Sequence, residues 1–207
     1  MTEITAQDVA ALRKKTGAGM MDAKRSLEES SGDLEAAERL LMERGLASAR
    51  KRADRAADQG TIGSYLHFQA DRPVIGVLVE LVCETDFVAK STEFKDAAND
   101  IAMHVAWARP RWLSRDEVPD SAIDDERSLI TAQARNEGKP EEVIAKIVDG
   151  KVGSFYADTV LLDQTFANAE KFAGTVGEMV ETLGVQMREN IAVRRFSRLG
   201  VGEDSTE

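Results

Sequence analysis

The stretch 73-PVIGVLVELVCETDFVAK-90 decides the fold. Its first part, Pro73 to Cys83, is almost entirely apolar and rich in β-branched side chains, which is typical of a strand that is buried on both faces. Thr85 can then cap a short helix that begins at Asp86, because its hydroxyl can accept a hydrogen bond from a free N–H group of the first turn. The Asp86 carboxylate also favours this position, since the start of a helix is the positive end of its dipole. Phe87 is therefore expected in the first turn of that helix, at the rim of a sheet.

Two interpretations of the Phe87 ring follow from this position. The ring either belongs to the core of its own chain, or it is an aromatic anchor that a rigid platform presents to a partner. Cys83 is expected to be an inert buried thiol, because apolar surroundings raise the pKa of a thiol. The alternative is a nucleophile set of Cys83, His104 and Asp86, which would make the chain a thiol hydrolase.

Three extended segments predict a small antiparallel sheet. Residues 61–68 and 73–83 flank the turn 69–72 as in a β-hairpin, and residues 191–199 are expected to return to the same sheet. A helix over 93–108 should cover the sheet, because it carries one apolar face of Phe94, Ala97, Ala98, Ile101, Val105 and Ala108. These elements predict the α+β class.

A helical insertion and a final helix complete this region. Residues 121–156 have narrow apolar stripes and a Gly138-Lys139-Pro140 turn, which predicts an antiparallel helical hairpin whose second helix ends at Asp149-Gly150. Thr175 and Glu178 form a capping box at the start of the last helix.

His104 lies at the edge of the apolar face of the helix over 93–108. The simpler interpretation is a partly buried histidine that a backbone carbonyl satisfies. The alternative is a contact with a partner beside Phe87.

The first 45 residues predict a bundle of three short helices. The helices are expected after the Thr5 capping box, over 20–27 and over 33–45, with glycines in the turns between them. Such a bundle has a thin core and gains stability by docking on a larger body. Between the first two helices, Met20 and Met21 either fill the bundle core or offer an adaptable apolar contact to a partner.

A basic connector follows the bundle over residues 45–57. Its lysine and arginine side chains form a solvated helix face or a docking surface for an acidic helix or a nucleic acid, and the lack of interleaved aromatics weakens the nucleic-acid option. Up to Ala56 the chain carries 11 basic and 10 acidic residues, whereas the remainder carries 16 and 27. This shift predicts a helical domain over 1–56 and a core domain over 57–207.

Composition excludes several classes of protein. A single cysteine cannot form an intramolecular disulfide, and one cysteine with two histidines cannot build a four-ligand zinc cage from those residue types. The sequence shows neither a signal peptide nor an apolar run of the roughly 20 residues that span a bilayer. A net charge of −10 argues against general binding to nucleic acid. We expect a cytoplasmic protein without membrane contact.

The search for catalytic chemistry points to a binding protein. The chain contains neither GxGxxG nor GxxxxGK[ST], so no phosphate-binding loop is expected, and no pair of carboxylates stands out by its spacing. We therefore expect no enzyme activity, no cofactor and no bound metal.

Two motifs resemble signatures of the bacterial elongation factor Ts family. They are ALRKKTGAGMMDAK at residues 11–24 and TDFVAK at residues 85–90, and the segment IAMHVA at 101–106 and the Gly138-Lys139-Pro140 turn are also similar to that family. The resemblance covers nearly the whole chain. It implies a three-helix bundle like a ubiquitin-associated domain, a core of the dimerisation type and a helical-hairpin insertion.

The chain is similar to the short members of this family, because it has one three-stranded set where longer members have two copies of the core. Short members pair two chains, so the resemblance implies a homodimer. A small sheet whose edges need cover is consistent with this expectation.

The resemblance also implies a function, which is guanine-nucleotide exchange on elongation factor Tu. Thr85, Asp86, Phe87 and Val88 match the segment that enters the nucleotide-binding domain and dislodges its magnesium ion, with Phe87 as the wedge. Further contacts are implied for Leu12, Thr16, Gly17, Gly19, Met20, Met21, Met103 and His104. The competing hypothesis is a non-catalytic adaptor whose bundle binds helical or ubiquitin-like partners.

Overall fold

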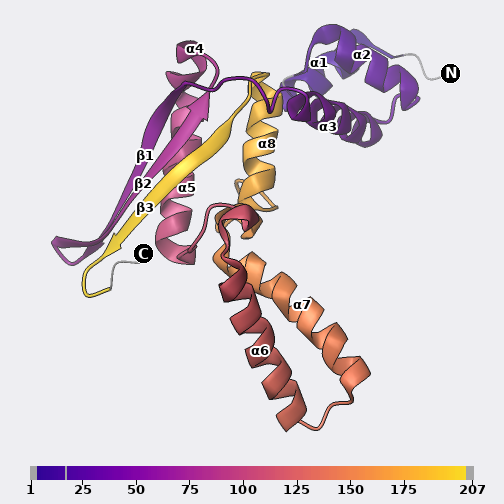
Figure 1. Ribbon diagram of the computed structural model, residues 1–207. Coiled ribbons are helices and arrows are strands. Elements are labelled where there is room, and N and C mark those ends of the chain that lie inside the picture. Colours follow the sequence, from indigo (N-terminus) through magenta and orange to yellow (C-terminus); the bar gives the residue numbers. More distant parts are fainter. Residues whose placement is uncertain (1–3, 17, 204–207) are drawn as a thin grey trace. The chain divides into compact units, whose positions relative to one another are not determined.

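The computed structural model describes residues 4–16 and 18–203 and has the predicted α+β architecture (Figure 1). The chain folds into two compact units that interleave along the sequence. One unit comprises Met1–Gly60, Val82–Phe94 and Val180–Ala192, and the other comprises Thr61–Leu81, Lys95–Met179 and Val193–Glu207. The division into domains at residue 57 stays a prediction.

Three helices open the chain as predicted: α1 (Ala6–Thr16), α2 (Met20–Glu29) and α3 (Leu34–Arg50). The Thr5 backbone N–H donates to the Asp8 carboxylate at 2.9 Å and the Asp8 N–H donates back to the Thr5 hydroxyl at 3.2 Å, so the capping box is confirmed. The Asp33 carboxylate caps α3 by accepting hydrogen bonds from the Glu35 and Ala36 N–H groups. A small core joins the helices, made of Leu12, Ala23, Leu27 and Ala37 with Ile4, Val9 and Leu41 beside it.

The predicted end of the third helix at Gly45 is wrong. Helix α3 continues to Arg50, and Gly45 lies inside it against the side chain of Val185. A Cβ at position 45 would overlap that side chain, so close packing explains this glycine better than a helix stop.

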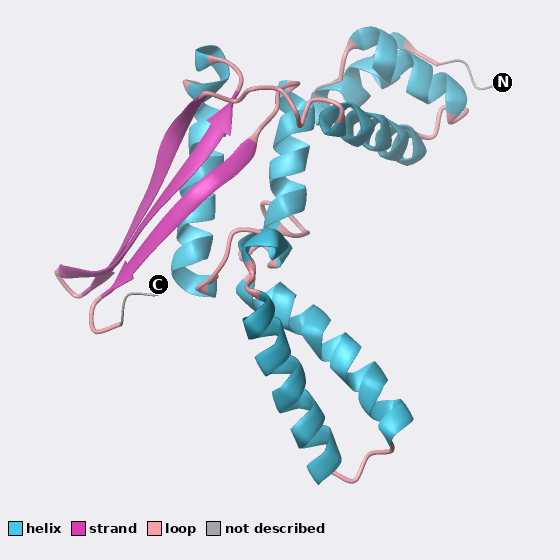
Figure 2. Ribbon diagram, viewed as in Figure 1, coloured by secondary structure: helices cyan, strands magenta, loops and turns pink. Residues whose placement is uncertain are grey.

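The sheet contains β1 (Gln59–Gln69), β2 (Arg72–Cys83) and β3 (Ala192–Gly200) in the order β1-β2-β3, and it is antiparallel (Figure 2). Helix α5 (Thr92–Ala108) lies along one face. There the Ser64 N–H donates to the Asn99 side-chain oxygen at 3.0 Å. Gly63 approaches the backbone of Ala98 so closely that a Cβ would collide with it. The predicted hairpin and the predicted covering helix are both confirmed.

The opposite face of the sheet is open to solvent and carries a patch of large apolar side chains. Along β1 and β2 the side chains alternate, as a strand with two different faces requires. The face that points away from α5 carries five large side chains, each more than half exposed: Ile62, Leu66, Phe68, Leu78 and Leu199. We call these five residues the open sheet face. The interpretation of residues 73–83 as buried on both faces is therefore wrong at Leu78.

Helices α6 (Asp120–Asn136) and α7 (Glu141–Thr159) form the predicted hairpin around Gly138, whose φ of +70° suits a glycine. The predicted end of the second helix at Asp149-Gly150 is wrong, because α7 passes through Gly150 and Gly153 to Thr159. The short 3₁₀ turns η1 (Arg115–Glu117) and η2 (Leu161–Asp163) flank the hairpin.

Helix α8 (Val176–Met187) begins at the predicted capping box. The Thr175 N–H donates to the Glu178 carboxylate at 2.8 Å, and the Glu178 N–H donates to the Thr175 hydroxyl at 3.1 Å. Among the residues that the structure describes, no helix is both long enough and apolar enough to cross a membrane.

Candidate functional site

Phe87 projects from a short, well-anchored helix, α4 (Asp86–Ala89). The Thr85 hydroxyl accepts a hydrogen bond from the Val88 N–H at 3.4 Å, so the predicted cap is confirmed. Val88 is buried beneath the helix, whereas the Phe87 side chain is 82% exposed. The interpretation of Phe87 as a core residue is therefore wrong, and its ring is available to another molecule.

The charged groups of α4 pair along the surface of the helix. Lys90 Nζ lies 2.6 Å from the Asp86 carboxylate, and this hydrogen bond and charge lower the pKa of Asp86 below its usual value. Both groups are largely exposed, so the pair orients the Asp86 side chain more than it stabilises the fold.

The Glu189 carboxylate holds the loop that leads into α4. One oxygen accepts hydrogen bonds from the backbone N–H groups of Glu84, at 3.0 Å, and Thr85, at 3.1 Å. The other oxygen accepts the Thr85 hydroxyl at 2.5 Å. Glu189 was not predicted from the sequence, because more than 100 positions separate it from the loop and no local pattern marks the contact.

The glycine-containing loop after α1 leads into two exposed methionines at the start of α2. Met20 is 60% and Met21 67% exposed, so the interpretation that places both in the bundle core is wrong. The Thr16 hydroxyl donates to the Leu12 carbonyl at 2.7 Å and accepts from the Ala18 N–H at 3.3 Å, which shapes the loop. Gly19 has extended backbone geometry at the start of α2. Gly17 lies outside the described residues.

Leu12 does not fit a direct contact with a partner. Its side chain is 1% exposed and belongs to the small core that joins α1, α2 and α3. Helical spacing places Leu12 on the inner face of α1 and therefore beneath the loop at Thr16. In this structure it supports the loop from inside.

His104 is likewise an interior residue, 1% exposed. The Ala167 N–H donates to Nδ1 at 3.1 Å, so Nε2 carries the hydrogen and donates to the Gln164 side-chain oxygen at 3.0 Å. Burial lowers the pKa of His104, and the hydrogen bond to Gln164 opposes that shift. The simpler interpretation of a satisfied histidine describes this geometry, although the partners are a side-chain amide and a backbone N–H. A surface contact through His104 is ruled out by its burial, and Met103 beside it is partly exposed.

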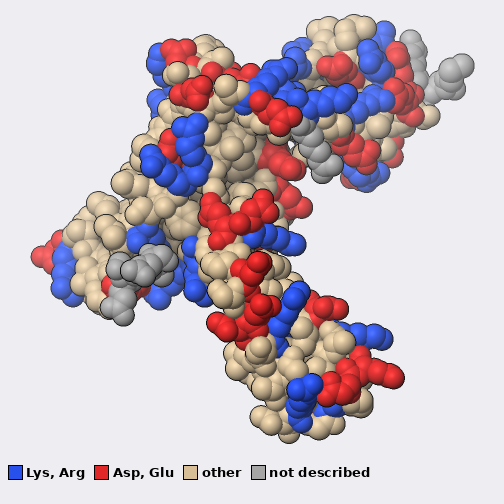
Figure 3. Space-filling model, viewed as in Figure 1, with Lys and Arg blue, Asp and Glu red and all other residues tan. Residues whose placement is uncertain are grey.

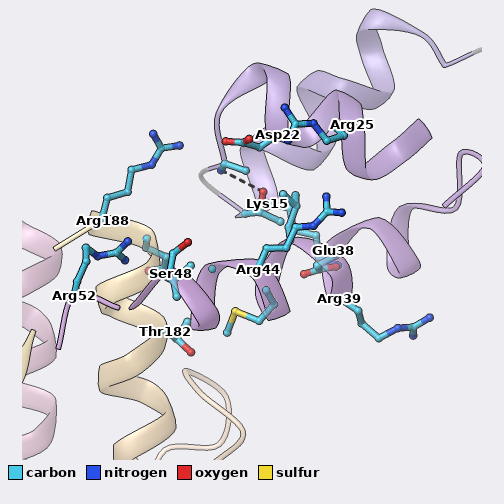
Figure 4. A pocket seen from close by; sticks show the side chains of 17 residues that line it. Lys15, Asp22, Arg25, Glu38, Arg39, Arg44, Ser48, Arg52, Thr182 and Arg188 are labelled. Atoms are coloured by element: carbon cyan, nitrogen blue, oxygen red, sulfur yellow. Dashed lines mark hydrogen bonds and ion pairs between the residues drawn. The ribbon is translucent and has the colours of Figure 1, made fainter. Parts of the chain in front are cut away.

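A basic groove of about 620 Å³ lies beside the same loop (Figure 4). Its charged lining comprises Lys15, Arg25, Arg39, Arg44, Arg52 and Arg188, with only Asp22 and Glu38 opposing them. Lys15 is paired with Glu38 and Arg44 with Glu29. Within the described part of the chain, the side chains of Arg25, Arg39 and Arg188 have no hydrogen-bonding or ion-pair partner.

The positive groove contrasts with the net charge of −10 of the whole chain. Figure 3 shows basic atoms gathered over the N-terminal helices, with acidic atoms among them. A groove of this charge complements an acidic surface. Arg52 of the basic connector and the neighbouring Arg44 both line this groove, and the docking interpretation of the connector stays a prediction.

Cys83 does not form a catalytic centre. It is fully buried, its thiol donates to the Thr85 carbonyl at 3.2 Å, and burial, reinforced by the charge of Glu189, raises its pKa. His104 donates to Gln164 and accepts from Ala167, so both of its ring nitrogens are already engaged. Over residues 4–16 and 18–203, no cluster of histidine, cysteine, aspartate and glutamate has the arrangement of a metal site.

Comparison with known proteins agrees with the two motifs. A family model described as "Elongation factor TS" matches residues 6–203. Elongation factor Ts of Fervidobacterium nodosum is 47% identical over 201 residues, which cover 97% of this chain and 100% of that protein. The proteins of the same name from Syntrophomonas wolfei and Carboxydothermus hydrogenoformans are 48% and 46% identical over 97% of this chain and 91% and 90% of their own lengths.

Proposed function

Since this chain belongs to the elongation factor Ts family and is therefore a translation elongation factor, we propose that it is the guanine-nucleotide exchange factor of elongation factor Tu. The observation that carries the proposal is the exposed ring of Phe87 on a capped, anchored helix. A largely exposed aromatic ring costs solvation free energy in the isolated protein and recovers it when a partner buries it. The factor acts by binding and carries out no covalent chemistry.

The primary contact is the segment Thr85, Asp86, Phe87 and Val88, of which the first three residues are exposed and Val88 supports them from within. Phe87 enters a gap between partner helices near the nucleotide, while Val88 stays buried and fixes the direction in which the ring projects. The displacement of partner helices dislodges the magnesium ion that neutralises the nucleotide phosphates. Without the ion, the phosphate charges repel one another and GDP leaves more readily.

The second contact is the loop from Thr16 to Met21 together with the basic groove. Met20 and Met21 supply adaptable apolar surface, and the unpaired arginines of the groove attract acidic side chains of the partner. Leu12 and His104 act from inside, because each is buried in the element that presents a contact. The partly exposed Met103 is the residue of its helix turn that is able to reach a partner.

We also propose that two copies of the chain pair through the open sheet face. Five large apolar side chains on one face of a three-stranded sheet form the kind of patch that monomers rarely leave uncovered. A second sheet packed on this face would complete a sandwich about 10 Å thick. The dimer would work in the cytoplasm, where translation takes place, without direct contact with nucleic acid or membrane.

Stopped-flow release of a fluorescent GDP from elongation factor Tu tests the exchange function directly. We expect the chain to accelerate release and to bind the nucleotide-free partner more tightly than the GDP complex, because coupling between two ligands is reciprocal. The adaptor hypothesis predicts instead that binding ignores the nucleotide state. Sedimentation of the chain alone and with elongation factor Tu, with and without GDP, reports self-association and this antagonism together.

A further inference from the structure

We infer that Glu189 is a positioning residue that fixes the Thr85–Val88 segment in the geometry needed for exchange, an inference that rests on the proposed function. Glu189 is not part of the Thr85–Val88 segment and does not line the basic groove. Its carboxylate accepts three hydrogen bonds from Glu84 and Thr85, immediately before α4. It therefore acts on Phe87 through the loop that carries it.

The contact is reciprocal and joins two loops. We call the hydrogen bonds among Glu84, Thr85, Glu189 and Asn190 the clasp. While Glu189 receives the N–H groups of residues 84 and 85, the Glu84 carboxylate receives the Asn190 N–H at 2.7 Å. Both loops lie outside regular structure, between β2 and α4 and between α8 and β3. Without the clasp, three backbone N–H groups that no helix or sheet satisfies would have to find water.

The clasp extends to the connector that follows α3. The Asn190 side-chain amide donates to the carbonyl groups of Ala53 at 3.0 Å and Arg55 at 2.7 Å, and the Arg55 guanidinium lies 3.4 Å from the Glu84 carboxylate. The loop bearing Phe87 is thus tied to the chain that leaves the N-terminal helices. The turn at Glu189 and Asn190 therefore contacts both the loop before α4 and the connector after α3, and all three segments belong to the same compact unit.

A carboxylate suits this position for a chemical reason. All three groups that face Glu189 are donors, and an ionised carboxylate accepts on both oxygens, whereas an amide accepts on one only. The turn is fixed by Arg188, whose φ of +59° lies in the left-handed region and ends α8 just before Glu189.

The first test uses the unaltered chain and measures backbone hydrogen exchange residue by residue. We expect the N–H groups of Glu84, Thr85 and Asn190 to be protected, although they lie outside helices and strands. Exchange of these three at the rate of an unstructured chain would overturn the clasp, whatever the behaviour of any variant.

The second test compares Glu189→Gln with Glu181→Gln, which makes the same change of charge at an exposed position of α8. Cys83 is the only cysteine of the chain, and its fully buried thiol reacts with a thiol reagent only when the loop opens. Because hydrogen bonds to charged groups are worth about 1.5–3 kcal/mol, Glu189→Gln should raise the labelling rate of Cys83, expressed per thiolate, roughly 10- to 150-fold. The rate is expressed per thiolate because the charge of Glu189 also raises the pKa of this thiol, so its loss alone would speed labelling. Glu181→Gln should leave the labelling rate unchanged.

The exchange assay then separates positioning from general stability. Glu189→Gln should lower the acceleration of GDP release about tenfold, and Glu189→Asp, which keeps the carboxylate, should restore part of it. In a chain that already carries Phe87→Ala, the substitution at Glu189 should have little further effect, because both act through one ring. A full additional loss in that background would refute the positioning role.

The two proposals fail in different ways. If Cys83 in Glu189→Gln reacts no faster than in Glu181→Gln, the clasp is refuted even where exchange activity is normal. If the clasp measurements succeed but the unaltered chain never accelerates GDP release, the exchange function is refuted and the clasp stands as a feature of the fold.

Discussion

Replacement of Phe87 by alanine is the sharpest perturbation of the proposed mechanism. The ring is 82% exposed, so it contributes little to the fold of the isolated chain. A substitution at such a position usually changes the free energy of unfolding by less than about 0.5 kcal/mol. Any large effect on nucleotide release therefore reports the contact with the partner and not a loss of structure.

The size of that effect follows from the same exposure. Nearly all of the ring lies in water before binding, so the partner can bury almost its full apolar area, and burial of a phenylalanine side chain is worth roughly 1.5–3 kcal/mol. If this free energy appears only when GDP is displaced, Phe87→Ala should slow the accelerated release by about 10- to 150-fold. Phe87→Leu keeps most of the apolar area and should lose only a small part of the acceleration.

Stopped-flow release of fluorescent GDP from elongation factor Tu measures these rates, and thermal unfolding of each variant checks the fold. Binding of Phe87→Ala to nucleotide-free elongation factor Tu should persist, because Met20, Met21 and the basic groove are intact. An unchanged release rate for Phe87→Ala would refute the wedge role of the ring.

Three further predictions address the rest of the molecule. Leu78→Glu places a charge in the open sheet face and should yield a monomer in sedimentation, whereas the same change at the exposed Leu129 of α6 should not; a Leu78→Glu dimer would contradict pairing through this face. In urea unfolding, Gly63→Ala should lower the free energy of unfolding by about 1–3 kcal/mol, because the added Cβ collides with α5. Gly150→Ala has open space around it and should raise the free energy of unfolding by up to about 1 kcal/mol. Burial lowers the pKa of His104, so the unfolded chain binds an extra proton below its ordinary pKa of about 6.5. The contribution of neutral His104 to the free energy of unfolding should therefore be complete above that pH and should decrease as the pH falls below it. The urea midpoint should follow this decrease, and His104→Gln should make the midpoint less dependent on pH in this range.

Local chemistry allowed most elements of the fold to be predicted. The capping boxes at Thr5 and Thr175 and the cap at Thr85 depend on residues three positions apart, so the sequence contains the whole interaction. The error at Gly45 has the opposite origin. A glycine is a helix stop only when its surroundings allow it, and Gly45 instead makes room for Val185, which lies 140 positions further along the chain.

The sequence predicts those features of the candidate site that depend on neighbouring residues, but not those that depend on packing between distant elements. A short motif places Phe87 at the start of a helix, but whether the ring points outward depends on which neighbour is buried, and here that neighbour is Val88. Leu12 and His104 lie within or next to recognisable motifs, yet their burial depends on packing between elements. The clasp of Glu84, Glu189 and Asn190 has no sequence pattern at all, because its members meet only after the strands have paired.

Under the proposed mechanism, one exposed ring is too weak to account for nucleotide exchange. Acceleration of nucleotide release by about 10⁴ requires roughly 5.5 kcal/mol of differential binding, which exceeds what a single phenylalanine supplies. The remainder must come from loss of the magnesium ion and from a second contact. Two contacts add their free energies only if binding at one does not have to order the other, because ordering a flexible segment consumes the gain. The hydrogen bonds that tie the Phe87 loop to the connector of the N-terminal helices meet this requirement during folding, before any partner arrives.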